Sequence, residues 1–465
     1  MARMPRWFRL ACCLLAWSAA AWSQPLPPEV EAALDAQGLP ADAVTVLVAP
    51  AEGGAPRVAH RIDAPVNPAS IAKLATTYAA LDLLGPTFAW TTPVYFDGPV
   101  RLGTLEGNLV LQGQGDPKLV MERLWLLLHR VRALGVHTIA GDIVLDRSAF
   151  TLPPHDPAAF DNQPLRPYNA SPDALLVNYK AVSVTFTPEG NVARVRTEPP
   201  LAGVHWPATV PLSAAAECGD WITALGADFG NPERIRFSGR FPRACGEQTW
   251  QIAFPDAAGY AGRAILALWQ ELGGHLRGQV REGTAPQGQK PAFEFTSPPL
   301  AEVIRDINKF SNNVMAQQVF LTLSLQQRGS GTFEGSREVL RNWWRERIGG
   351  EPPVTENGSG LSRNESMTAR QLAQLLQSAW ASPLMPELAS SLPLLGVDGT
   401  LRRQRQNVGL AHLKTGSLNE VAGVAGYVHG PQGRRYVLVA IANHRKAAAI
   451  RPAVQALVEW AARQP

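Results

Sequence analysis

The sequence predicts an α/β (α+β) protein in which an antiparallel sheet with helices forms one domain and nested β-rich domains are inserted into it. Three observations support this. A helical pattern follows Ser70, strand-like runs follow Lys414 near the C-terminus, and residues 74–310 are rich in strand patterns. That stretch is far longer than a connection within one domain requires. We therefore expect a domain whose two halves lie far apart in the sequence.

The first half contains a predicted helix with a serine and a lysine at its start. Asn67 is suited to cap the helix and Pro68 to its first position. Helical spacing then continues up to Gly85-Pro86, with apolar residues at Ile71, Leu74, Ala75, Tyr78 and Leu81. Lys73 shares a helix face with Ser70, so its amine can reach the Ser70 hydroxyl. Taken alone, Lys73 also fits a solvated position on an ordinary amphipathic helix.

A second polar motif, Ser311-Asn312-Asn313, precedes the predicted start of another helix at Val314. The Ser311 hydroxyl could pass a proton between Lys73 and a leaving amine, because a hydroxyl both donates and accepts. The Asn313 amide could hold a substrate carbonyl or the Lys73 side chain. The alternative is a plain loop that caps the helix.

A third motif, Lys414-Thr415-Gly416, stands before two strand-like runs, 421–428 and 436–442, which the turn 430–433 separates. This pattern predicts an antiparallel meander. Gly416 would leave room beside the strand edge for a substrate backbone. The alternative is a lysine that protects an edge strand against pairing with another chain.

The three motifs occur in the order S-x-x-K, S-x-N, K-T-G, which is typical of active-site serine enzymes that act on peptidoglycan and penicillin. Over nearly all its mature length, the chain resembles the class C low-molecular-mass penicillin-binding proteins, which are periplasmic D-alanyl-D-alanine carboxypeptidases/endopeptidases. The resemblance extends to the segments 113–117, 358–363 and 392–401. One departure is Asn357, where the family usually has Asp, and this puts the local hydrogen bonding in question.

The resemblance implies a transpeptidase/β-lactamase-like catalytic domain that carries the inserted domains. We expect the catalytic domain at 24–96 and 293–465, an outer inserted domain at 97–180 and 257–292, and an inner one at 181–256. It also implies a serine-type D-Ala-D-Ala carboxypeptidase or DD-endopeptidase that cleaves peptidoglycan stem peptides and is inhibited by β-lactam antibiotics.

The chemistry of the motif residues fits this activity. Lys73 can act as a base toward Ser70 only if burial and a second cation lower its pKa, and Lys414 is that cation. Lys414 and Thr415 could also hold the terminal carboxylate of the substrate. The backbone N–H groups of Ser70 and Ser417 could form an oxyanion hole. The expected catalytic residues are thus Ser70, Lys73, Ser311, Asn313 and Lys414, with Thr415, Gly416 and Ser417 binding substrate.

Residues that contact the substrate's diaminopimelate side chain are implied by the resemblance alone. The matching positions are Asp161 and Tyr168 from the outer insert, and Arg363 and Asn419 from the catalytic domain. Asp146 is the alternative to Asp161, because the spacing between Asp161 and Tyr168 is longer than usual in the family. Each of these residues could instead be an ordinary polar surface group.

Two other function classes remain open at this point. One is a β-lactamase or esterase with the same motifs, and the other is a non-catalytic peptidoglycan-binding or penicillin-sensing protein. The long insertion and the lack of any Glu between 141 and 188 count against a class A β-lactamase, whereas the intact motifs count against the non-catalytic class. We expect no cofactor, no metal and no nucleic-acid partner, since the sequence has no H-E-x-x-H, no dinucleotide-binding glycine loop and no strong net charge.

Residues 1–23 have the pattern of a cleaved signal peptide, with Arg3, Arg6 and Arg9 before an apolar run that is shorter than the ~20 residues of a membrane span. This predicts a periplasmic protein. Cys218 and Cys245 are then the only cysteines left, and we hypothesise that they form a disulfide, with a zinc site as a poor rival. Peripheral membrane contact and oligomeric state stay open.

Overall fold

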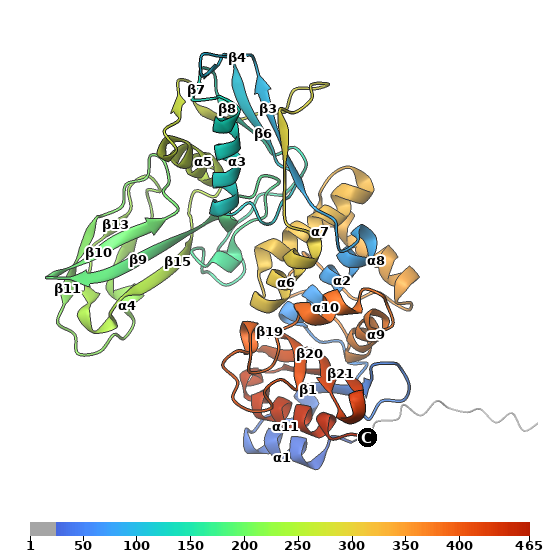
Figure 1. Ribbon diagram of the computed structural model, residues 1–465. Helices are drawn as coiled ribbons and strands as arrows, with labels where there is room; N and C mark the ends of the chain where they lie inside the picture. Colours follow the sequence, from blue (N-terminus) through green and yellow to red (C-terminus); the bar gives the residue numbers. More distant parts are fainter. Residues whose placement is uncertain (1–24) are drawn as a thin grey trace, which may run out of the picture.

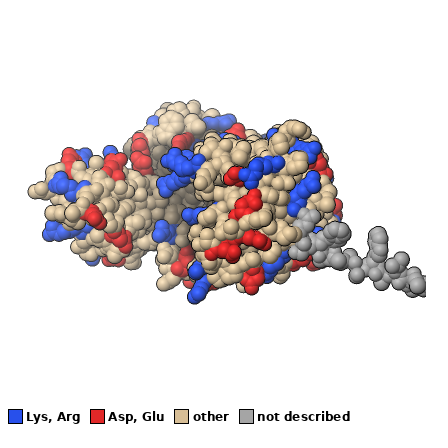
Figure 2. Space-filling model, turned by 90° about the horizontal axis from the view of Figure 1, so that it is seen from below, with Lys and Arg blue, Asp and Glu red and all other residues tan. Residues whose placement is uncertain are grey.

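Figure 1 shows the computed structural model, which describes residues 25–465. The predicted signal peptide at 1–23 lies outside the described residues. A body that contains both ends of the described chain carries an arm made from the middle of the chain. Figure 2 shows basic and acidic side chains interspersed over one face, with a hollow where the arm meets the body. No helix within 25–465 is long and apolar enough to cross a membrane.

The body is built on a five-stranded antiparallel sheet with the order β19-β20-β21-β1-β2. The predicted meander is confirmed, and β21 pairs next with β1, so that the first and last parts of the chain share one sheet. This pairing explains why a domain can hold an insertion of such length. The strands are β1 (Val44–Pro50), β2 (Val58–His60), β19 (Ala411–Leu418), β20 (Val421–His429) and β21 (Arg435–Asn443).

Helices cover both faces of this sheet and bury a separate apolar core on each. The helices α1 (Pro28–Ala36) and α11 (Arg451–Ala462) cover one face. The other face lies against a helical layer that contains the catalytic motifs. That layer consists of α2 (Lys73–Leu84), α6 (Leu300–Phe310), α7 (Asn313–Arg328), α8 (Phe333–Arg347), α9 (Ala369–Trp380) and α10 (Met385–Ser391).

The arm has two larger sheets, with the orders β17-β8-β6-β3-β18 and β14-β11-β10-β9-β15. The first consists of β3 (Thr91–Asp97), β6 (Asn108–Gln112), β8 (Ile143–Asp146), β17 (Val280–Glu282) and β18 (Phe293–Thr296), with α3 (Met121–Ala133) and α5 (Tyr260–Glu271) packed beside it. The second consists of β9 (Ala181–Glu189), β10 (Val192–Glu198), β11 (Thr209–Ser213), β14 (Phe241–Pro242) and β15 (Gln248–Ala253).

Smaller elements complete the arm. A four-stranded sheet has the order β16-β7-β5-β4, and β12 pairs with β13. Their bounds are β4 (Val100–Arg101), β5 (Thr104–Leu105), β7 (Thr138–Ile139), α4 (Trp221–Ala224), β12 (Ala227–Asp228), β13 (Arg236–Phe237) and β16 (His275–Leu276).

Two strands at the expected domain boundary belong to the sheet of the arm. The sequence placed β3 and β18 in the catalytic domain, at 24–96 and 293–465, but both hydrogen-bond within the sheet of the arm. We propose moving this boundary to about residues 90 and 297, with the expected domain division otherwise kept as a prediction. The structure also contains the disulfide between Cys218 and Cys245, within the arm.

Candidate active site

Ser70 lies in a 3₁₀ turn, Ala69–Ala72, that leads directly into α2. The expected helix is present up to Leu84, but Ser70 precedes its α-helical part and Lys73 is its first residue. Asn67 contacts the start of the 3₁₀ turn, because its Oδ1 accepts from the Ala69 N–H at 2.8 Å. Ala69 itself has φ +47°, a left-handed conformation that is unusual for alanine.

The backbone at Gly360 packs closely against the turn that contains Ser70. A Cβ on Gly360 would lie 2.0 Å from the Ala69 carbonyl oxygen, and its φ of +77° also favours glycine. The backbone of 358–360 therefore lies directly against the turn that presents Ser70. Gly416 does the same from β19, since a Cβ there would lie 2.6 Å from the Pro68 carbonyl oxygen. Gly416 thus packs against the Ser70 turn, a role that the sequence did not indicate.

Lys73 is fully buried and reaches three oxygen atoms. Its Nζ lies 2.9 Å from Ser70 Oγ and 2.6 Å from Asn313 Oδ1, and it also donates to the Ser359 carbonyl. Burial and the nearby Lys414 hold the pKa of Lys73 well below its usual value, although Glu365 opposes this. A neutral amine has two N–H donors and one lone pair, which match two fixed acceptors and the Ser70 hydroxyl proton. The solvated-lysine alternative is wrong.

In the second motif, one residue caps a helix and the other two contact the catalytic lysines. Asn312 Oδ1 caps α7 by accepting from the Met315 N–H at 3.0 Å. Ser311 ends α6 in the left-handed conformation, φ +58°, and Asn313 begins α7. The sharp turn between α6 and α7 places both side chains beside the lysines. The loop-cap alternative therefore holds for Asn312 alone.

Lys414 lies on β19 and is also fully buried, so it is not a protective surface charge on an edge strand. Its Nζ donates to Ser311 Oγ at 2.9 Å and to the Thr415 carbonyl at 2.8 Å. Burial lowers the pKa of Lys414 to about 7. Thr415 is half-buried and Ser417 is exposed, so this strand borders both the buried lysines and the solvent.

The comparison with known families decides the identity. The model of the D-Ala-D-Ala carboxypeptidase 3 (S13) family matches residues 26–464. The chain belongs to this family. It is a class C low-molecular-mass penicillin-binding protein and a serine-type D-Ala-D-Ala carboxypeptidase/endopeptidase. The β-lactamase and non-catalytic alternatives are not favoured.

Individual relatives agree with this family. A D-alanyl-D-alanine carboxypeptidase from an Actinomadura species is 29% identical over 391 residues, 79% of this chain and 71% of that protein. The crystal structure of penicillin binding protein 4 (dacB) from Haemophilus influenzae has a TM-score of 0.76 at 22% identity, and covers 94% of this chain and 99% of that one. A penicillin G acylated predatory endopeptidase from Bdellovibrio bacteriovorus, in complex with an immunity protein, has a TM-score of 0.53 at 16% identity, covering 90% and 91%.

In this S13 chain, a loop of the arm reaches the catalytic residues. The Tyr168 carbonyl accepts from Asn313 Nδ2 at 3.3 Å. Within the loop, Asp161 accepts from the Tyr168 hydroxyl at 2.7 Å and from Asn169 Nδ2 at 2.8 Å. Asp161 therefore holds the shape of the loop, in addition to any contact with substrate. Asp146, the alternative carboxylate, is 1% exposed and accepts from the backbone of Ser148 and Ala285, so it is unavailable to a substrate.

Arg363 and Asn419 come together in the body, as Arg363 Nη1 donates to the Asn419 carbonyl at 3.0 Å. The Arg363 guanidinium also lies 4.7 Å from the ring centroid of Phe160, on the arm's loop. Arg363 thus joins the loop of the arm to the residue that follows β19. Sequence reasoning missed Phe160, although it stands directly before Asp161.

The segment around Asn357 contains the other residues that sequence reasoning missed. Asn357 Oδ1 accepts from the N–H and the hydroxyl of Ser359, and its Nδ2 donates to the Leu361 carbonyl at 3.0 Å. An Asp could make the first two contacts but could not donate the third. Glu365 lies behind this turn and is 2% exposed. The segment 358–363 was a signal for Ser359, but nothing in the sequence marked Glu365.

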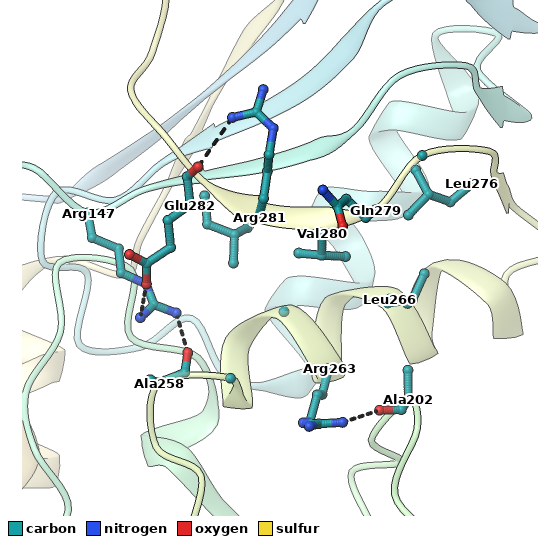
Figure 3. A pocket seen from close by; sticks show the side chains of 14 residues that line it. Arg147, Ala202, Ala258, Arg263, Leu266, Leu276, Gln279, Val280, Arg281 and Glu282 are labelled. Carbon is teal, nitrogen blue, oxygen red and sulfur yellow. Dashed lines mark hydrogen bonds and ion pairs between the residues drawn. The ribbon is translucent and has the colours of Figure 1, made fainter. Parts of the chain in front are cut away.

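One cavity of the described chain lies away from the catalytic motifs. It has a volume of about 600 Å³ and lies in the arm between β17 and α5, lined by no motif residue (Figure 3). Its three arginines are already paired: Arg147 with Glu282 at 3.2 Å, Arg263 with Glu233 at 3.0 Å, and Arg281 with Asp142 at 2.6 Å. Within 25–465 no group of three or more His, Cys, Asp or Glu side chains is arranged to hold a metal ion.

Proposed function

We propose that Ser70 of this enzyme attacks the D-Ala-D-Ala bond of peptidoglycan stem peptides, both terminal and cross-linked, and forms an acyl-enzyme. The observation that supports this most directly is the 2.9 Å contact between Ser70 Oγ and the buried Lys73 Nζ. A serine hydroxyl needs a neighbouring base to become a nucleophile, and a buried lysine of lowered pKa supplies one. The family relationship supplies the substrate class.

Acylation follows from the hydrogen bonds of Lys73. The Ser70 hydroxyl proton moves to Lys73 Nζ while Ser70 Oγ bonds to the carbonyl carbon of the penultimate D-Ala. The resulting ammonium donates to Ser70 Oγ, Asn313 Oδ1 and the Ser359 carbonyl, its three available acceptors. The backbone N–H groups of Ser70 and Ser417 are the donors that we assign to the developing oxyanion.

Release of the leaving group needs a proton at its nitrogen. Ser311 is suited to deliver it, because its hydroxyl accepts from Lys414 and can donate its own proton to the departing amine. The carbon–nitrogen bond breaks as that proton arrives, and the proton held by Lys73 restores the hydroxyl of Ser311. Protonated Lys414, together with Thr415, can hold the terminal carboxylate of the substrate.

Hydrolysis of the acyl-enzyme requires a water molecule that loses its proton to Lys73 as its oxygen bonds to the acyl carbon. Ser70 Oγ then leaves and regains a proton. A β-lactam would acylate the same serine, but its ring-opened leaving group stays attached. A relative of the same fold carries a penicillin G acyl group, which supports this part of the proposal.

The proposed cellular location and substrate rest on the N-terminal sequence and on the family. Residues 1–23 resemble a cleaved signal peptide, so we propose a periplasmic enzyme that meets peptidoglycan there. Diaminopimelate-containing stem peptides would contact Asp161 and Tyr168 on the loop of the arm, and Arg363 and Asn419 in the body.

One experiment tests the nucleophile and the substrate together. The mature protein and its Ser70→Ala variant are incubated with a fluorescent penicillin and, separately, with cross-linked muropeptides whose products are identified by mass. We expect labelling, loss of D-Ala and separation of cross-linked dimers with the wild type, and none of them with the variant. Labelling of Ser70→Ala would remove Ser70 from the mechanism.

A further inference from the structure

Glu365 is a buried carboxylate to which neither the sequence nor the mechanism above gives a role. It lies in the segment between Arg363 and α9 and is 2% exposed. Its Oε1 accepts from the backbone N–H of Glu356 at 2.9 Å and of Asn357 at 3.3 Å. Its Oε2 is buried and has no hydrogen-bond partner within residues 25–465. A carboxylate in this position costs folding free energy unless another group compensates its charge.

A short series of hydrogen bonds joins Glu365 to Lys73. Glu365 Oε1 accepts a hydrogen bond from the Asn357 N–H, and Asn357 Oδ1 accepts one from the Ser359 N–H at 2.9 Å. The Ser359 carbonyl in turn accepts from Lys73 Nζ. Each step lies within one tight turn, where Gly358 has φ +74° and Gly360 has φ +77°. The position of the Ser359 carbonyl, and hence the direction of one Lys73 N–H, depends on this turn.

Glu365 also interacts with Lys73 electrostatically. The charged groups that act on Lys73 are Lys414 from β19 and Glu365 from behind the turn, whereas those that act on Glu365 are Lys73 and Glu356. Glu356 is only half-buried, and its carboxylate is already bound by Ser362 and Asn364. Burial raises the pKa of Glu365, whereas two backbone N–H groups and Lys73 lower it, and in its ionised form Glu365 is the buried anion that favours the protonated form of Lys73.

We infer that Glu365 is a positioning residue for the Ser70–Lys73 pair, which it serves by fixing the Ser359 carbonyl and by stabilising the ammonium that Lys73 becomes during acylation. This inference rests on the proposed role of Lys73 as the base. The proton that leaves Ser70 Oγ stays on Lys73 Nζ and does not reach Glu365. The carboxylate acts through its charge and through the turn.

The test is the pH dependence of acylation by a fluorescent penicillin. Glu365→Gln keeps the shape and an oxygen acceptor for the two N–H groups, but removes the charge. Without the anion Lys73 holds its proton less firmly, so the acidic limb of the rate profile should move to lower pH by about one unit, a tenfold change in proton affinity. The maximal rate should fall about tenfold, because the ammonium is less stabilised in the transition state.

Three further variants make the result specific. Glu356→Gln removes a neighbouring carboxylate that has its own hydrogen-bond partners. This variant should leave the acidic limb of the pH–rate profile at the wild-type pH. Glu365→Asp and the double variant Asn357→Asp/Glu365→Gln each keep one carboxylate beside the turn, and both should return the limb to the wild-type pH. Thermal melting of every variant checks that it is folded.

An unmoved limb in folded Glu365→Gln would overturn the inference, as would an equal shift in Glu356→Gln. If Glu365→Gln does not fold, the double variant decides, and a displaced limb there contradicts the inference. The proposed function fails separately, by the absence of Ser70-dependent labelling in the wild type. An enzyme that labels normally and shows no limb shift in Glu365→Gln would refute only the role of Glu365.

Discussion

The ammonium of Lys414 on β19 donates to Ser311 Oγ at 2.9 Å, which joins the strand of the third motif to the turn of the second. The same turn is joined to the first motif, since Asn313 Oδ1 lies 2.6 Å from Lys73 Nζ. The catalytic centre is therefore one hydrogen-bonded network between α2, the α6–α7 turn and β19. A change in any one element should affect the two lysines together.

Lys73→Arg tests the need for a neutral base. Arginine keeps the positive charge but does not lose its proton in proteins, and its guanidinium is too large for a fully buried site with three fixed acceptors. We expect the rate of penicillin acylation to fall by at least about a thousandfold, as measured by stopped-flow fluorescence. Lys290→Arg, at an exposed position, is the control. Acylation near the wild-type rate would contradict the role of Lys73.

Gly360→Ala tests the close packing against the Ser70 turn. The new Cβ would lie 2.0 Å from the Ala69 carbonyl oxygen, so the turn must shift, and misplacement of a nucleophile by about 1 Å can cost about a hundredfold in rate. Gly350→Ala is a matched control, because Gly350 has φ +70° but open space around it. We expect slow acylation only in Gly360→Ala. Equal losses in both variants would assign the effect to backbone strain.

Lys414→Met tests the cost of burying an amine. The pKa of Lys414 is about 7 in the folded chain, against ~10.4 for a lysine in the unfolded chain. Between these two pH values the unfolded chain binds one more proton than the folded chain. The free energy of unfolding of the wild type therefore rises with pH in this range. The variant should lose penicillin acylation, yet melt about 5 °C higher at pH 6, with a gain that shrinks toward pH 10. A Tm gain that is the same at both pH values would contradict this account.

The same pKa predicts how peptide binding depends on pH. Lys414 can hold a substrate carboxylate only while it is protonated, which is the case below about pH 7 in the free enzyme. We expect the KM for a D-Ala-terminated peptide to rise about tenfold for each pH unit above that value. Steady-state kinetics between pH 6 and 9 would measure this. A substrate analogue with an amidated C-terminus should show a flat KM and serves as the control.

Asp161→Ala tests the contact with the substrate side chain. A charge-assisted contact with the diaminopimelate amine is worth ~1.5–3 kcal/mol, so kcat/KM for such peptides should fall about ten- to a hundredfold, while penicillin acylation stays nearly unchanged. Asp156→Ala, on the same loop and exposed, is the control. If both reactions slow together, Asp161 acts by holding Tyr168 against Asn313, the contact that the structure shows at 3.3 Å.

The sequence predicted the fold class and brought out the three motifs because each is a local pattern. The helical spacing after Ser70 and the strand alternation after Lys414 reflect one buried face each, and such periodicity is visible without tertiary contacts. The domain boundary expected near residues 96 and 293 did not anticipate that β3 and β18 pair in the arm, because strand pairing is non-local. A strand signal shows that a segment pairs, but not with which sheet.

The parts of the site that stayed hidden depend on burial and on approaches between distant segments. Nothing adjacent to Glu365 in the sequence distinguishes it from a surface glutamate, and only the structure shows that it is buried and accepts from the backbone N–H groups of Glu356 and Asn357. Gly416 likewise looked like a place for substrate, whereas its neighbour is Pro68, more than three hundred residues earlier. Only the packing of β19 on the Ser70 turn shows this.

The pairing of β1 with β21 has a consequence for how the enzyme is made. A ribosome delivers Ser70 and Lys73 early, then the whole arm, and Lys414 only near the end, while N-terminal parts of a chain generally fold first. The central strand β21 must arrive before the sheet can close behind the nucleophile. The unfinished chain therefore holds a serine without its activating environment, so hydrolytic activity begins only when synthesis of the chain is almost complete.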